Sequence, residues 1–222
     1  MDAGHHEALA RCLAWAVLED GEAWLGGPSP TRLDTLLWGA ATRVSLAKCE
    51  LPSWRIFGPL QDPAFCVPIV ARTGHPTLEI KWARALEAIH FSLTEAMRDL
   101  RSSVLAWVER HGPGPQDELG EVDLGDVDSL MARLAGRPGM YLGSNDSWDL
   151  RCFLTGMDRG GDWLGVPVLP RLKEIIKSIE DRSREAYGSP FAAYRFYRED
   201  PAHLLAWAGI KPATHPSPIR FV

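Results

Sequence analysis

The sequence has little that would direct the chain out of the cell or into a membrane. Its first residues lack the cationic start and continuous apolar segment of a signal peptide, and apolar runs such as Leu13 to Leu18 are far too short to span a bilayer. The four cysteines are dispersed, with no CxxC pair, which excludes a disulfide-stapled scaffold. Because each cysteine lies among apolar neighbours, we expect buried, reduced thiols and a cytoplasmic protein without a membrane partner.

Positive charge is also scarce. Lys and Arg number 24 against 29 Asp and Glu, which gives a net charge of -5 over 222 residues. A general nucleic-acid binder should be basic, so we expect no direct nucleic-acid partner. The apolar share of 45% is that of an ordinary globular protein. Nine tryptophans are many for this length, and each either fills a core or faces a partner.

Motifs of the common enzyme classes are missing. The chain has no GxSxG, HExxH, Walker phosphate loop or GxGxxG. His5 and His6 have no third metal ligand nearby, and His90, one turn after Glu87, has the spacing of a structural helix-face pair. Cys49, beside Lys48, is the only cysteine with even a mild claim to be a reactive thiol. We therefore expect no catalytic residue, metal or cofactor, although residues distant in sequence can still assemble a site.

Apolar residues recur at helical spacing along most of the chain, which predicts a mainly α fold with at most a minor short β element. The segment from Thr77 to Arg110 either forms one helix of about 50 Å or breaks near Ser92. Prolines between residues 52 and 68 predict a loop, with an edge strand over 65–70. Further helices are expected at about 6–20, 30–47, 127–134, 148–157, 170–187 and 201–207.

The best linker candidate follows the long helical segment. The run His111-Gly112-Pro113-Gly114-Pro115 breaks any helix, and an acidic stretch without Lys or Arg comes after it. We predict two helical subdomains packed together, with an N-terminal domain at 1–112, an acidic linker at 113–126 and a C-terminal domain at 127–222. The acidic stretch is either a solvated linker or a surface that steers a basic partner.

The sharpest local motif is Arg137-Pro138-Gly139-Met140-Tyr141-Leu142-Gly143. Pro138 and Gly139 suit the centre of a type II turn, with Gly139 at positive φ. Arg137 precedes a proline and is therefore pushed out of the helical region, so the preceding helix must end before it. Residues 140–142 would continue as a short extended piece. The motif is either a structural connector or a device that aims Arg137 and Tyr141 at a partner.

Two families carry similar residues. ATPase domains of type II topoisomerases have a similar Arg-Pro-Gly-Met-Tyr stretch beside their nucleotide site, but residues 148–153 lack the Glu and Asn that hold Mg²⁺ there, and 158–162 do not reproduce the nucleotide loop. Residues 126–207 more closely resemble one group of bacterial immunity proteins found beside polymorphic or contact-dependent toxins. Members carry a short helix ending in this seven-residue motif, a Leu/Phe-rich helix ending near Gly, and a less regular helical region.

The resemblance implies a noncatalytic protein that binds and neutralises a cognate toxin inside the producing cell. A toxin directed at nucleic acid would present a basic active-site cleft, to which carboxylates are complementary. Exposed tryptophans such as Trp54, Trp148 or Trp163 could anchor the interface. Alternatives left open are a helical enzyme or regulatory domain with a site assembled from distant residues, and a scaffold module. The expected partner-binding residues are Asp117, Glu118, Glu121, Asp123, Asp126, Arg137, Tyr141 and Trp148.

Overall fold

The structure of the protein is a computed structural model that describes residues 3–74, 81–114, 119, 124–195 and 200–213. Within these ranges the regular structure is helical and contains no β-strand, which confirms the mainly α fold. The chain divides into two compact units. The first unit comprises residues 1–37 and 51–119, and the second comprises residues 38–50 and 120–222. None of the described helices combines the length and the apolar character needed to cross a bilayer.

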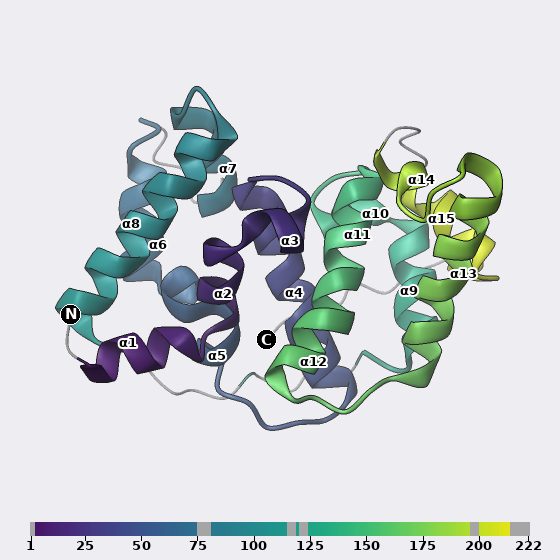
Figure 1. The fold of residues 1–222 in the computed structure, drawn as a ribbon, viewed down its shortest axis with the longest axis horizontal. Helices are drawn as coiled ribbons and strands as arrows, with labels where there is room; N and C mark the ends of the chain where they lie inside the picture. The colour runs from purple at the N-terminus through teal and green to yellow at the C-terminus, as the bar shows by residue number, and fades with distance from the viewer. Residues whose placement is uncertain (1–2, 75–80, 115–118, 120–123, 196–199, 214–222) are drawn as a thin grey trace. The chain divides into compact units, whose positions relative to one another are not determined.

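The first unit is organised around α2, whose Leu13 and Val17 are fully buried. Helices α1, α3, α5 and α8 and the 3₁₀-helix η1 all pack against α2. Figure 1 shows these elements in purple to blue-green. The helices of this unit are α1 (Ala3–Ala10), α2 (Leu13–Glu19), α3 (Gly21–Leu25), the start of α4 (Pro30–Leu46), α5 (Trp54–Phe57), η1 (Gly58–Gln61), α6 (Pro63–Ala71), α7 (Trp82–Ile89) and α8 (Leu93–His111).

Two long helical segments of the first unit are interrupted. The helix expected at 6–20 breaks at Cys12, whose backbone is extended, so that α1 and α2 are separate. The segment from Thr77 to Arg110 breaks between α7 and α8, which agrees with the second of the two predicted alternatives. Ser92 begins α8, since its hydroxyl accepts a hydrogen bond from the Glu95 N–H.

The predicted loop and edge strand between residues 52 and 70 are wrong, because this stretch forms α5, η1 and α6. Asp62 caps α6 by accepting a hydrogen bond from the Ala64 N–H, and Pro63 occupies the first helical turn, where its fixed φ is favourable. Phe65 and Ile69, four residues apart, bury one face of the helix. These local and packing terms outweigh the cost of Pro68 inside α6.

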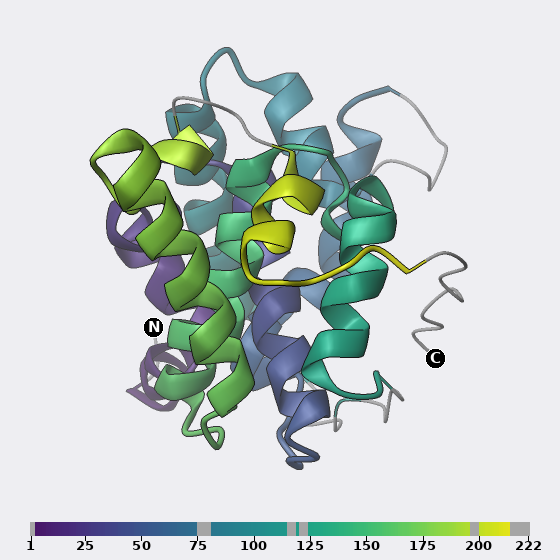
Figure 2. The same cartoon turned by 90° about the vertical axis from the view of Figure 1, so that its right-hand side faces the viewer.

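The second unit begins with the end of α4 and continues after residue 120. The helices expected near 127–134, 148–157, 170–187 and 201–207 are confirmed. In Figure 1, α11 and α12 follow one another in one column, and Figure 2 shows α15 between α9 and α13, both of which it contacts. The remaining elements are α9 (Val127–Gly136), α10 (Pro138–Leu142), α11 (Ser147–Thr155), the π-helical segment η2 (Gly156–Gly160), α12 (Gly161–Leu164), α13 (Pro170–Tyr187), α14 (Ala192–Arg195) and α15 (Pro201–Trp207).

Helix α4 contributes residues to both units, with the change between Leu37 and Trp38. The other crossing, between residues 119 and 120, falls inside the predicted linker at 113–126. No sequence pattern marks the crossing within α4, because its buried stripe runs unbroken from Leu33 to Val44. Residues 38–50 therefore belong with the C-terminal unit, although the sequence prediction places them in a domain at 1–112.

Within the second unit, α4 and α11 touch backbone to backbone at Gly39. A Cβ atom on Gly39 would lie 2.1 Å from the carbonyl oxygen of Phe153, far inside van der Waals contact. Any other residue at this position would force the two helices apart.

We predict that Gly39→Ala destabilises the protein. Overpacking of a rigid contact costs about 1–3 kcal/mol, and a clash with backbone has no flexible side chain to absorb it. Urea unfolding followed by circular dichroism measures the loss. The matched control is Gly21→Ala, whose new Cβ would meet only the Met97 Cε atom at 3.9 Å. Equal unfolding midpoints for Gly39→Ala and the unaltered chain would contradict the close approach.

Candidate functional site

The acidic residues expected to bind a partner fall mostly on residues that are not described: Asp117, Glu118, Glu121 and Asp123 lie outside the described ranges. Asp126 is exposed and caps α9, with its carboxylate accepting a hydrogen bond of 2.7 Å from the Ser129 N–H. This hydrogen bond lowers the pKa of Asp126 below its usual value. Asp126 therefore has a local structural role.

The turn predicted at Pro138 and Gly139 is wrong, because residues 138–142 form the one-turn helix α10. The positive φ in this region belongs to Gly143, at 75°, and not to Gly139. Arg137 does lie outside the helical region, with φ -150° and ψ 67°. Pro138 then occupies the first helical position, where its ring presets the helical φ, so a new helix starts where an extended piece was expected.

Helix α10 is held on one side and open on the other. Leu142 is 3% exposed and Tyr141 is half-buried, whereas Met140 is 50% exposed and Arg137 is exposed. The Tyr141 hydroxyl is buried and has no hydrogen-bond partner in the described part of the chain. Just beyond α10, the Ser144 hydroxyl donates to the buried Asp149 carboxylate, which fixes the connection to α11.

The tryptophans named as possible interface anchors are largely covered. Trp54 is 5% exposed and Trp148 is 6% exposed, so both fill a core, which is the alternative that leaves little of either ring for a partner, and Trp163 is half-buried. Trp148 instead supports Arg151, whose guanidinium lies 4.5 Å from the centre of the indole ring. Because α11 begins at Ser147, both side chains belong to the same helix.

His90 forms an ion-pair cluster of structural character in the first unit. Its Nε2 atom lies 2.8 Å from Asp99 Oδ2, which also accepts from Arg72 Nη1 at 2.7 Å. The Ser103 hydroxyl donates to the Asp99 carboxylate and not to the imidazole, so the cluster lacks a nucleophile–base pair. Glu87, predicted to pair with His90, instead accepts from the Ser29 hydroxyl and the Thr31 N–H at the start of α4.

We predict that Asp99→Asn destabilises the protein at pH 7 by about 1–3 kcal/mol, the value of hydrogen bonds to a charged group. Burial raises the pKa of Asp99, but hydrogen bonds from His90 and Arg72 outweigh it and leave the pKa below its usual range. The stabilisation is therefore present above the usual pKa of the carboxyl and disappears as the pH falls through the lowered value. Urea unfolding across this range should show the two proteins converging in acid, and a constant difference would contradict the cluster.

The four cysteines are free thiols. Burial raises the pKa of Cys12 to about 11 and that of Cys66 to about 12, which leaves both protonated and unreactive near neutral pH. Cys152 is also buried, and Cys49 has its Sγ atom 3.7 Å from the Ala47 carbonyl oxygen. Within the described ranges, no group of three or more His, Cys, Asp or Glu side chains is arranged to hold a metal ion.

Sequence reasoning missed the most connected side chain of the second unit, Arg43 of α4. Arg43 is fully buried, and its guanidinium makes five hydrogen bonds to acceptors between residues 157 and 167. A guanidinium has five N–H donors, so none is left over. The acceptors are the carbonyl oxygens of Met157, Asp158, Val166 and Pro167 and the carboxylate of Asp162.

Arg43 also explains the π-helical turn η2. The Gly161 N–H bonds to the carbonyls of Asp158 and Gly156, three and five residues earlier, and not to that of Met157, four residues earlier. The Met157 carbonyl is therefore available to Arg43, which donates to it at 2.9 Å. A Cβ on Gly161 would lie 2.2 Å from Arg43 Cδ, so glycine is required where the side chain passes.

We predict that Arg43→Met costs the second unit at least about 3 kcal/mol, because two buried carbonyls, two partly buried carbonyls and one carboxylate lose their donor. Arg43→Lys should also fail, since an ammonium cannot reach five separated acceptors. The matched control is Arg11→Met, which removes an exposed pair with Glu7 and should change stability by less than about 1 kcal/mol. Hydrogen exchange of amides 157–164 measures the effect, and unchanged protection in Arg43→Met would contradict the role of Arg43.

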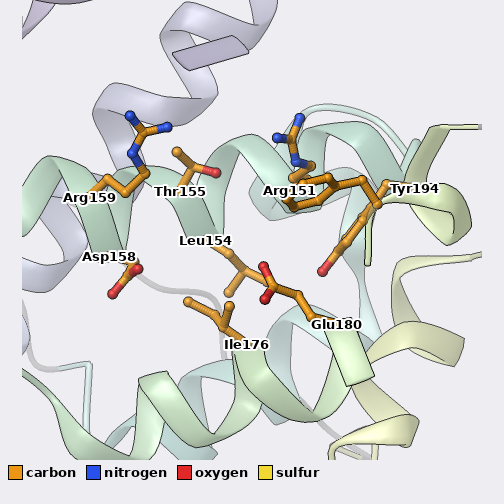
Figure 3. Close-up of a pocket in the computed structure, with 9 residues that line it drawn as sticks. Arg151, Leu154, Thr155, Asp158, Arg159, Ile176, Glu180 and Tyr194 are labelled. Carbon is orange, nitrogen blue, oxygen red and sulfur yellow. The ribbon is translucent and has the colours of Figure 1, made fainter. Parts of the chain in front are cut away.

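A cavity of about 120 Å³ opens in the second unit between α11–η2 and α13. Figure 3 shows Arg151, Thr155 and Arg159 with their polar ends on one side, while the carboxylates of Asp158 and Glu180 lie on the side of α13. Leu154 and Ile176 supply apolar walls, and Phe191 and Tyr194 complete the lining. The spacing of Arg151, Thr155 and Arg159 at four-residue intervals marks one helix face, which sequence reasoning could have noticed.

The charged groups of the cavity differ in how they are compensated. Asp158 pairs with Lys173. Arg151 and Glu180 have no ion pair in the described part of the chain; burial lowers the pKa of the first and raises that of the second. Burial also raises the pKa of Tyr194, which keeps its hydroxyl protonated. The cavity therefore holds a half-buried cation and a half-buried anion that form no ion pair within the described residues, although Arg184 and Arg151 attract the Glu180 carboxylate electrostatically.

Comparison of the chain with protein-family models, with curated proteins and with solved structures finds no significant match. The function must be argued from the motif around α10, from the cavity and from the contacts that hold them.

Proposed function

We propose that the protein is an immunity-type protein that binds and neutralises a cognate bacterial toxin in the cytoplasm of the producing cell, by direct contact and without catalysis. The partner class comes from the resemblance of residues 126–207 to one group of immunity proteins. The observation that carries the proposal is the exposure of Arg137, which directly precedes α10, and of Met140 within it. Both belong to the motif on which that resemblance rests.

The composition and the rigidity of α10 both support partner binding. Arginine and methionine are enriched at protein interfaces, and arginine is common among the residues that dominate binding energy. Leu142 is buried, and the hydrogen bond from Ser144 to Asp149 holds the following turn, so the backbone is fixed before binding. A partner that covers Arg137 and Met140 would have only two side chains to order, which keeps the entropic cost of binding low.

The acidic residues add a second element to the proposal. Asp117, Glu118, Glu121 and Asp123, together with the exposed Asp126, would attract a toxin with a basic active-site cleft. Such long-range attraction raises the association rate more than it holds the complex together, and salt screens it. Arg137 and Met140, by contrast, would contribute through direct contact and slow dissociation.

We predict that Arg137→Ala and Met140→Ala each weaken binding to the product of the adjacent toxin gene by about 5- to 30-fold, which corresponds to 1–2 kcal/mol at an interface contact. Tyr141→Phe is the matched control on the same helix, because it removes only a buried hydroxyl without a partner and keeps the ring. It should retain both affinity and stability. Biolayer interferometry measures the affinities, and thermal unfolding verifies that each variant folds.

Co-expression tests whether the protein protects the producing cell from the toxin. Cells that express the adjacent gene product should survive when this protein is present and should lose protection in the Arg137→Ala, Met140→Ala double variant. Absence of both a complex and protection would remove the proposal. If a complex forms and its affinity is unchanged in the Arg137→Ala and Met140→Ala variants, the function is retained but the interface lies elsewhere on the protein.

A regulatory domain with a site assembled from distant residues is the second candidate function, and the cavity favours it. The lining residues come from α11, η2, α13 and α14, so their proximity arises only in the fold.

A further inference from the structure

The cavity between α11–η2 and α13 separates charge of opposite sign across a small space. Arg151 and Arg159 belong to one wall and Glu180 to the other, as Figure 3 shows. A simple anion would gain from the arginines but be repelled by Glu180, and a simple cation would meet the reverse. Only a ligand that carries both charges matches the two walls together.

We propose that this cavity binds a small free α-amino acid as a zwitterion. Arg151 receives the carboxylate, Glu180 receives the ammonium group, and the apolar walls receive a short side chain. The inference concerns a site away from α10 and does not depend on toxin binding.

Arg151 is prepared to receive a carboxylate. Its guanidinium lies 4.5 Å from the centre of the Trp148 ring and 4.6 Å from that of Phe191, so aromatic groups hold the cation in place. The N–H groups of a guanidinium lie in its plane, so contacts over its faces leave them able to donate to a ligand. Because Arg151 forms no ion pair in the described part of the chain, a carboxylate bound through both oxygens would give it one.

Glu180 is the carboxylate available to an ammonium group. The other acidic side chain of the lining, Asp158, already pairs with Lys173. Glu180 has no such pair within the described ranges, and burial raises its pKa, so a bound cation would relieve its desolvation. The Tyr194 hydroxyl points toward Glu180 in Figure 3 and provides a further polar contact at this end.

The size of the cavity limits the ligand. Sites for cofactors and drug-sized molecules commonly occupy about 300–1,000 Å³, whereas this cavity has about 120 Å³. Leu154 and Ile176 line the space between the charged walls and would contact an aliphatic side chain. Nucleotides and large aromatic amino acids are too bulky, so we expect glycine, alanine, serine, threonine or valine.

The direct test is titration of the full chain with these five amino acids, observed through the Nε–Hε resonances of arginine in NMR spectra. We expect a saturable shift of the Arg151 resonance for at least one of them. Two derivatives of the best ligand separate its charges: the N-acetyl form keeps only the carboxylate, and the amide keeps only the ammonium group. Each should bind at least tenfold more weakly than the parent.

Substitutions in each wall of the cavity test which wall binds which charge of the ligand. Glu180→Gln and Arg151→Met should each reduce affinity at least tenfold, while Arg182→Met, which removes an exposed partner of Glu185 on the same α13, should leave it unchanged. Circular dichroism verifies that each variant folds. If Arg151→Met unfolds the protein, Glu180→Gln still tests the proposal, because glutamine has nearly the shape of glutamate and removes only its charge. The proposal is overturned if no amino acid gives saturation in the millimolar range, or if the acetylated or amidated form binds as tightly as the parent. Since toxin binding is measured separately, either inference can fail alone.

Discussion

The buried guanidinium of Arg43 is the interaction on which the second unit depends. A charge withdrawn from water carries a large desolvation cost, which only a complete set of partners offsets. Arg43 has such a set, because each of its N–H groups meets an oxygen of residues 157 to 167. A single side chain of α4 thereby fixes η2, α12 and the turn that follows them. Gly39, one turn earlier, brings the α4 backbone against α11, and Gly161 leaves room for the arginine to pass.

The same contacts shape the cavity. The backbone carbonyl oxygen of Asp158 accepts a hydrogen bond from Arg43, while the Asp158 side chain pairs with Lys173 of α13 and lines the cavity. The π-helical turn, stabilised by Arg43, carries Asp158 and Arg159 at the end of the row that starts at Arg151. The segment α11–η2 therefore carries both groups that hold the fold together and groups that line the cavity. The stiffness that Arg43 gives to the backbone keeps the arginines on one wall and the carboxylates on the other.

Local sequence features predicted most of the helices but not the contacts between them. The helices α4, α9, α11 and α13 could be predicted because the helical spacing of their apolar residues is visible within a few turns of sequence. Two wrong predictions also concern local features. The number of prolines between residues 52 and 68 favoured a loop, although Asp62-Pro63 is a typical helix start. Pro138 begins a helix where a turn was expected. The role of Arg43 could not be predicted, because its acceptors lie 114 to 124 residues away in sequence. The cavity could not be predicted for the same reason. The sequence also could not decide whether Trp148 belongs to the core or to an interface, because the residues that cover it are brought there by tertiary packing.

The sharing of α4 has a consequence for the order in which a nascent chain can fold. The contacts of the first unit are complete once residue 119 has been synthesised, whereas residues 38–50 belong with a unit whose remaining members begin at residue 120. Arg43 leaves the ribosome early and must wait until Pro167 has followed before its last acceptor exists. During that interval the end of α4 is an uncovered amphipathic segment with a charge in its apolar face. Closing so long a loop is slow, which makes this segment the one that most needs shielding from other chains during synthesis.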